Sequence, residues 1–199
     1  AQDGFVVTTL HDGASGVEAA LSGKFAIAVF DVMMPRLSGV DSLRQIRAAS
    51  SMPVLMLTAR GDDMDRILGL ELGADDYVPK TCPPRQLAAR LRAILRRTAR
   101  SGDTGTAPII CGDLCVRPEQ RRVEWKGGVV ELTSTEFNLL ELLARHAGRP
   151  VSKAELSEHA LGRPLARFDR SIDVHLSSIH HKLGELSDGR SCIQTVYRQ

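Results

Sequence analysis

Three polar side chains each follow a short stretch of the sequence that we expect to form a strand. The run 26–30 leads into Asp31, the run 53–57 into Thr58, and residues 74–79 into Lys80. Short apolar runs of this kind indicate buried strands of a parallel sheet, whose carboxyl ends meet at one edge. A carboxylate, a hydroxyl and an ammonium group gathered there would suit formation of an aspartyl phosphate, as nucleophile, hydrogen-bond donor and counter-charge. The alternative is that Asp31 only caps the helix that follows it.

The composition indicates an ordinary soluble globular protein of one or two domains. The 199 residues are 43% hydrophobic and 25% charged, with a net charge of +2. No apolar run approaches the roughly 20 residues of a membrane span, so we expect no membrane insertion. The four cysteines lack CxxC spacing, which favours reduced thiols in a cytoplasmic protein over a metal site. Since the charge is nearly balanced, any case for DNA binding must rest on motifs.

The elements that would position the three polar residues alternate between strand and helix. A first strand is expected at 5–9, and apolar spacing predicts helices at 13–21, 36–49, 62–72 and 83–98. This alternation predicts an α/β fold with a doubly wound parallel sheet.

A different pattern follows a small, polar linker at 99–107. Short strands at 109–111, 114–116, 122–125 and 129–132 predict an antiparallel sheet. Capping boxes at Thr133 and Ser152 open two helices, and a third helix is expected at 169–183. Its buried stripe would be Ile172, Leu176, Ile179 and Leu183. The other face, with the residues beside it, offers side chains suited to phosphates and base edges: Arg170, Ser171, Val174, His175, Ser177, Ser178 and His181. A plain solvated helix face is the alternative.

These motifs resemble a known family over nearly the whole chain. The stretches VFDVMMPRLSGVD, PVLMLTAR and LGLELGADDYVPK are similar to a response-regulator receiver domain of two-component signalling. The winged-helix effector of the OmpR/PhoB subfamily is similar to two later stretches, ELTSTEFNLLELLARHAGRPVSKAEL and RSIDVHLSSIHHKL. Within that subfamily, the sequence most resembles the Cpx-type envelope-stress regulators. The resemblance implies a flavodoxin-like receiver domain at 1–98 whose first β-α unit is missing, a linker at 99–107, and a C-terminal winged helix-turn-helix domain at 108–199.

The resemblance also implies roles for individual residues. Asp31 would be the phosphoacceptor, Thr58 and Lys80 would bind the phosphoryl group, and Tyr77 would be the aromatic switch. Mg²⁺ would be held by Asp31 and the carbonyl of Met33, together with a pair of acidic residues that has no counterpart in these 199 residues. Because Mg²⁺ prefers six oxygen ligands, we expect Asp31 to be phosphorylated poorly in this chain.

The implied partners are a sensor histidine kinase, double-stranded DNA, RNA polymerase and a second copy of the chain. Dimerisation through the receiver domain would use charged and polar residues at Arg66, Asp75, Asp76, Gln86, Arg90 and Arg97. Pairing of Asp76 with Arg90 and of Asp75 with Arg97 is expected, whereas Arg66 faces Gln86 instead of the family's glutamate.

Two other functions compete with a transcription regulator controlled by phosphorylation. Phosphatases of the haloacid dehalogenase type also form an aspartyl phosphate, but they need an aspartate where Met33 stands, so we expect no enzyme. A degenerate or truncated regulator, which acts without phosphorylation as a DNA-binding or protein-interaction module, is the remaining alternative.

Overall fold

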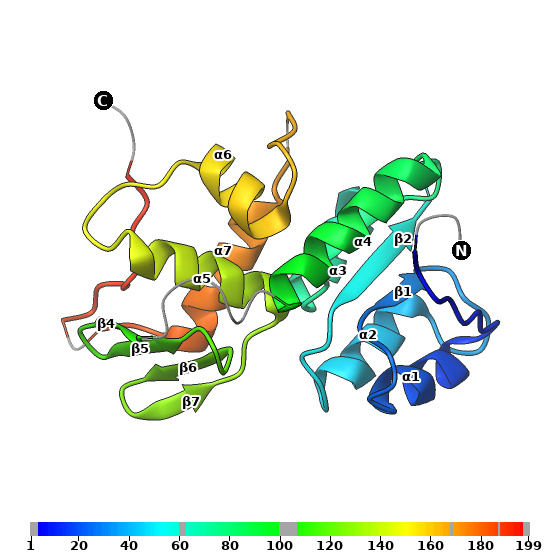
Figure 1. Cartoon of the computed structure of the whole chain (residues 1–199), viewed down its shortest axis with the longest axis horizontal. Helices are drawn as coiled ribbons and strands as arrows, with labels where there is room; N and C mark the ends of the chain where they lie inside the picture. Colours follow the sequence, from blue (N-terminus) through cyan, green and yellow to red (C-terminus); the bar gives the residue numbers. More distant parts are fainter. Residues whose placement is uncertain (1–3, 60–62, 100–106, 168, 187, 197–199) are drawn as a thin grey trace. The chain divides into compact units, whose positions relative to one another are not determined.

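The computed structural model describes residues 4–59, 63–99, 107–167, 169–186 and 188–196, and within these it leaves aside the side chains of 63–66 and 97–99. The chain divides into two compact units, 1–96 and 97–199, which are described separately. Figure 1 shows the first with a parallel sheet and the second with an antiparallel one. Among the described residues, no helix has both the length and the apolar character to cross a membrane.

The first unit is an α/β sandwich. Its parallel strands β1 (Ala28–Asp31), β2 (Val54–Thr58) and β3 (Asp76–Pro79) lie in the order β1-β2-β3. They alternate with α1 (Gly13–Leu21), α2 (Gly39–Arg47), α3 (Asp63–Glu71) and α4 (Pro84–Ala99). The predicted doubly wound receiver fold is confirmed.

Alternate residues of β2 explain why both faces of this sheet are covered. Val54 and Met56 pack with Leu43 and Ile46 of α2 in one apolar core, to which α1 also contributes. Leu55 lies in a second core with Val78 and with Ile94 of α4. A strand buried on both faces reads as a continuous apolar run, and such a run predicted β2 from the sequence.

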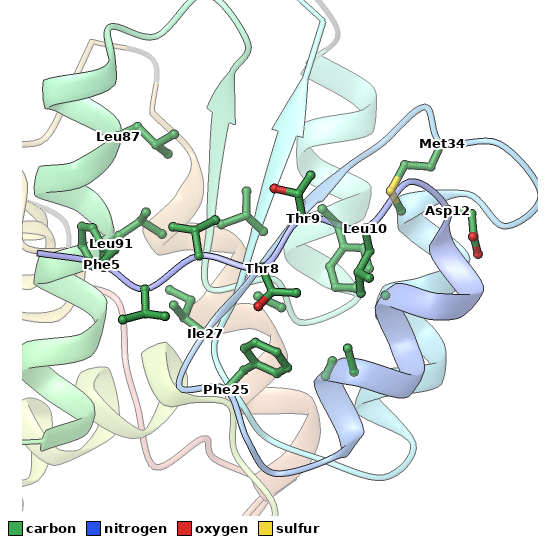
Figure 2. Close-up of a pocket in the computed structure, with 18 residues that line it drawn as sticks. Phe5, Thr8, Thr9, Leu10, Asp12, Phe25, Ile27, Met34, Leu87 and Leu91 are labelled. Carbon is green, nitrogen blue, oxygen red and sulfur yellow. The ribbon is translucent and has the colours of Figure 1, made fainter. Parts of the chain in front are cut away.

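The prediction of a strand at 5–9 is wrong. Residues 5–10 are extended (Figure 2) but belong to no sheet, and the edge of β1 away from β2 pairs with no other described strand. A strand is defined by its hydrogen-bonded neighbour, which apolar patterning within one segment does not reveal.

The second unit places helices against an antiparallel meander. Strands β4 (Ile109–Cys111), β5 (Leu114–Arg117), β6 (Arg122–Trp125) and β7 (Gly128–Val130) lie in sequence order. The helices are α5 (Ser134–Arg145), α6 (Lys153–Leu156), the single π-turn η1 (Ser157–Leu161) and α7 (Ser171–Leu183). Both predicted capping boxes are present, at Thr133 with Glu136 and at Ser152 with Glu155.

The core of this unit explains how α7 is fixed. The predicted stripe holds, because Ile172, Ile179 and Leu183 are buried and Leu176 packs partly against the same core. That core also includes Trp125 of β6 and residues of α5. The helix therefore has one face fixed against the sheet and α5 and another face open to solvent.

Candidate functional site

The structure brings two of the three polar strand ends into direct contact. Asp31 ends β1, and Lys80 follows β3, which is separated from β1 by β2. The Lys80 Nζ lies 2.7 Å from Asp31 Oδ2, and both side chains are partly exposed. The ammonium group thus offsets the carboxylate charge at an edge of the sheet that solvent can reach.

Thr58 and Met33 flank this ion pair from the neighbouring backbone. Thr58 ends β2, is buried, and donates its hydroxyl to the carbonyl of Ala59 at 3.0 Å. The amide of Met33 donates to Asp31 Oδ1 at 3.0 Å, which orients the carboxylate. The backbone amide of Lys80 donates to the carbonyl of Thr58 at 2.8 Å, so the β2 and β3 ends are tied together. A rotation of the Thr58 side chain would be required before its hydroxyl could serve a group on Asp31.

Tyr77 lies inside the first unit. Its ring is buried in the same core as Val54 and Met56. A Cβ added to Gly69 of α3 would lie 2.4 Å from the ring, so glycine there makes room for the aromatic side chain. Tyr77 thus points into the core of the unit, and its role as a switch stays a prediction.

The described residues do not fit Mg²⁺ by themselves. They contain no group of three or more Asp, Glu, His or Cys side chains that could hold a metal ion. Asp31 is paired with Lys80, and one carboxylate with one carbonyl falls short of six oxygen ligands.

The predicted dimer contacts need correction. Asp75 is fully buried, where its Oδ2 accepts from Arg47 at 3.0 Å and from the amide of Val54 at 2.9 Å. Its carboxylate is thus part of the receiver interior, and the prediction that it pairs across a dimer is wrong. Asp76 is also buried and pairs with Arg90 of its own chain at 2.5 Å.

Of the remaining predicted dimer residues, Gln86 is the one whose side chain the structure describes. Gln86 is exposed on α4, where its Oε1 lies 3.3 Å from the sulfur of Cys82. The side chains of Arg66 and Arg97 lie outside the described residues.

The solvent face of α7 carries part of the predicted DNA-contacting set. Arg170 precedes the helix and is exposed, and Ser177 and His181 are exposed along it. Val174 is half-buried on the same side. These four residues are not among the buried residues of the second unit's core, and their role in binding DNA stays a prediction.

Three residues of that set face inward, contrary to prediction. Ser171 and His175 are buried, and Ser178 donates its hydroxyl to Glu136 Oε1 at 2.5 Å. His175 follows Ile172 by three positions and so lies close to the buried stripe. Sequence spacing alone placed it at the edge of the polar face, whereas its side chain is fully buried in the folded unit.

Glu136 is the residue that sequence reasoning missed. It is buried, and its carboxylate accepts from Ser178, from Lys182 Nζ at 2.6 Å and from the amide of Thr133 at 2.8 Å. Burial favours the neutral acid, but the bond and charge of Lys182, with the bonds of Ser178 and Thr133, outweigh it and lower the pKa of Glu136. The capping box signalled the residue, whereas its contact with α7 required the tertiary structure.

A second buried carboxylate fixes the start of α7. Asp169 Oδ1 accepts from the amide and hydroxyl of Ser171, and its Oδ2 pairs with Arg163. Burial disfavours the ionised form, but the Arg163 and Ser171 bonds prevail and hold the pKa of Asp169 well below its usual range. The first turn of the helix is therefore anchored to the loop before it.

Comparison with known proteins connects the two units. The family model for the response regulator receiver domain matches residues 1–92, and the model for the C-terminal part of transcriptional regulatory proteins matches residues 127–199. The transcriptional regulatory protein CpxR of Escherichia coli (strain K12) is 43% identical over 98% of this chain and 85% of its own length. The chain belongs to the OmpR/PhoB-type response regulators.

A second relative and a solved structure are also similar to this chain. The CpxR homolog of Haemophilus influenzae is 40% identical over 98% of this chain and 86% of its own length. The solved structure of a RitR mutant has the same fold, with a TM-score of 0.78 at 19% identity, over 98% of this chain and 86% of that one. The OmpR/PhoB regulators are two-component transcription regulators with a receiver and a DNA-binding domain, not enzymes.

Proposed function

We propose that phosphorylation of Asp31 by a sensor histidine kinase controls dimerisation of this regulator and its sequence-specific binding to DNA. The observation that carries the proposal is the contact of Asp31 with Lys80 at the partly exposed edge of the sheet. The chain is organised as a receiver domain at 1–98, a linker at 99–107 and a winged-helix domain at 108–199.

The charges around Asp31 support the acceptor role. Transfer would form a bond between a carboxylate oxygen and phosphorus as the bond from phosphorus to the histidine nitrogen breaks, with the electron pair returning to that nitrogen. Lys80 would then face a group of greater negative charge than the carboxylate it contacts at 2.7 Å. Thr58 would turn its hydroxyl from Ala59 toward the phosphoryl oxygens. The buried side chain of Tyr77 would act as the aromatic switch that packs inward together with Thr58.

The open face of α7 supports a role in the DNA major groove. Arg170 and His181 offer phosphate contacts, Ser177 offers a hydrogen-bonding hydroxyl, and the Val174 methyl groups suit a thymine methyl. Glu136 and Asp169 hold the helix from within, so these side chains stay in a fixed register. We propose RNA polymerase as the further partner at the promoter.

DNA binding with and without a phosphodonor tests this function. The fluorescence anisotropy of a labelled duplex from a regulated promoter should report tighter binding after acetyl phosphate treatment, to the extent that Asp31 is labelled. Asp31→Ala should abolish the response and leave the unstimulated affinity unchanged. A response that persists in Asp31→Ala would refute the role of this carboxylate.

One observation favours the second candidate, a regulator that acts without phosphorylation. The described residues do not supply the oxygen ligands that Mg²⁺ requires. This candidate predicts DNA binding that acetyl phosphate leaves unchanged even when an acidic β-α unit is added before residue 1.

A further inference from the structure

Helix α7 carries one acidic side chain, that of Asp173. It lies in the first turn of the helix and is exposed. Arg170 stands three positions before it and Ser177 four positions after it, so the carboxylate is a neighbour of both on the helix surface. Asp173 therefore borders the side of α7 that the proposed function directs toward DNA.

Lys153 of α6 offsets the charge of this carboxylate. Its Nζ lies 2.6 Å from Asp173 Oδ1, and both side chains are half-exposed (Figure 1 labels the two helices). Among the described residues, none donates a hydrogen bond to the other oxygen, Oδ2. A carboxylate without such a cation would repel the phosphates of any DNA sequence. One oxygen of Asp173 is thus held by the preceding helix, and the second is available to a donor.

The base edges of the major groove differ in what they offer a carboxylate, which can only accept hydrogen bonds. Cytosine presents the donor N4, whereas guanine presents the acceptors N7 and O6 and thymine presents the acceptor O4. Adenine offers the donor N6, but its acceptor N7 lies beside it. Cytosine is therefore the base that a carboxylate favours. The first residues of a recognition helix are also those that reach base edges.

Given the proposed binding of α7 in the major groove, we infer that Asp173 is a specificity-determining residue that accepts a hydrogen bond from N4 of a cytosine. Lys153 is a positioning residue, because it holds Oδ1, leaves Oδ2 for the base and offsets the negative charge near the phosphates. Contacts to phosphates fix where a protein lies on DNA, whereas contacts to bases select the sequence. Asp173 thus contributes to the choice of site, and the basic side chains contribute to affinity for any site.

Selection of bound duplexes from a randomised DNA library tests the inference on the whole 199-residue chain. The parent should enrich duplexes with cytosine at one position of the recognised site. Asp173→Ala should reduce the preference for cytosine at that position by about fivefold or more and leave the other positions unchanged. Glu119→Ala is the matched control, because it removes an exposed carboxylate from the turn between β5 and β6 and should keep the parent's preference.

Anisotropy titrations with the selected duplex test the role of Lys153. Lys153→Met should weaken binding by about threefold or more while Asp173 is present, because the carboxylate then repels the phosphates. In the Asp173→Ala background the same substitution should change affinity by less than about 1.5-fold, since no carboxylate remains to be offset. An equal loss in both backgrounds would show that Lys153 acts on DNA by itself and would refute its positioning role.

The library selection separates failure of the inference from failure of the proposed function. A parent that selects a site whose cytosine preference persists in Asp173→Ala would overturn the inference and leave DNA recognition by α7 standing. A preference lost in Asp173→Ala that is for another base would show the assignment to cytosine to be wrong. A parent that enriches no sequence would overturn the proposed function and the inference together.

Discussion

Replacement of Lys182 by methionine should destabilise the DNA-binding domain through Glu136. Lys182 Nζ lies 2.6 Å from a carboxylate that is 1% exposed, while the lysine side chain itself is 32% exposed. A hydrogen bond to a charged group contributes about 1.5–3 kcal/mol. Because water reaches the lysine and replaces part of that interaction, we expect a loss of about 1–2 kcal/mol in the free energy of unfolding. Methionine keeps most of the aliphatic packing, so the loss reports the charge.

Lys153 provides the matched control. Its Nζ also lies 2.6 Å from a carboxylate, that of Asp173, but the two side chains are 53% and 49% exposed. An exposed pair of this kind contributes roughly 0–1 kcal/mol. Lys153→Met should therefore change the free energy of unfolding by less than about 0.5 kcal/mol.

Urea unfolding followed by tryptophan fluorescence measures both variants. Trp125 is the one tryptophan of the chain and is buried in the second unit, so its emission reports that unit alone. With a slope of about 1–3 kcal/mol per molar urea, Lys182→Met should lower the midpoint by roughly 0.5–1 M. Equal effects of the two substitutions would refute the claim that burial of Glu136 makes its ion pair important.

Acid supplies a second check on the same contact. The pKa of Glu136 is lowered in the folded protein from a usual value of 4.5, so its ionised form contributes stability above that value. This contribution is lost as the pH falls through the folded-state pKa. The difference between Lys182→Met and the parent should be full at pH 7 and should vanish in acid; a difference that grew in acid would contradict the sign.

Three further substitutions test the DNA contact, the dimer and the receiver interior. His181→Arg should tighten DNA binding, since an arginine side chain always carries a positive charge that can face a phosphate; anisotropy titrations at fixed salt that show the parent's affinity would exclude this contact. Gln86→Glu should strengthen the receiver dimer slightly by giving Arg66 a partner, and a weaker dimer in sedimentation would count against that interface. Asp75→Asn should lower the stability of the first unit by about 3–5 kcal/mol, because it leaves Arg47 opposite an uncharged partner in the interior, and thermal unfolding with a change below about 1 kcal/mol would contradict this.

Local patterns predicted most of the fold. The apolar runs before Asp31 and Thr58 identified strands because a strand covered on both faces needs apolar side chains throughout. The capping boxes at Thr133 and Ser152 marked helix starts because the required residues lie within one turn. In each case the physical cause lies within a few residues of its effect.

The errors arose where a distant partner decides the outcome. In the sequence, Asp75 looks like a surface carboxylate. In the structure it is buried and paired with Arg47, which lies 28 positions away in the chain. In the sequence, Ser178 looks like a residue that contacts DNA. In the structure its hydroxyl donates to Glu136 of α5. The segment 5–10 has the composition of a strand, yet no described neighbour pairs with it. The spacing of apolar residues within one helix or strand does not predict contacts with residues that are distant in the sequence.

Intact-protein mass spectrometry after acetyl phosphate treatment tests whether Asp31 accepts the phosphoryl group. We expect one hydroxylamine-sensitive phosphoryl group on Asp31, at low occupancy in the 199-residue chain and at high occupancy when an acidic β-α unit is fused before residue 1. Asp31→Ala should remove it in both forms. Efficient labelling of Asp31 in the 199-residue chain would refute the argument about metal ligands, and labelling of the fused form at another residue would refute Asp31 as the phosphoacceptor.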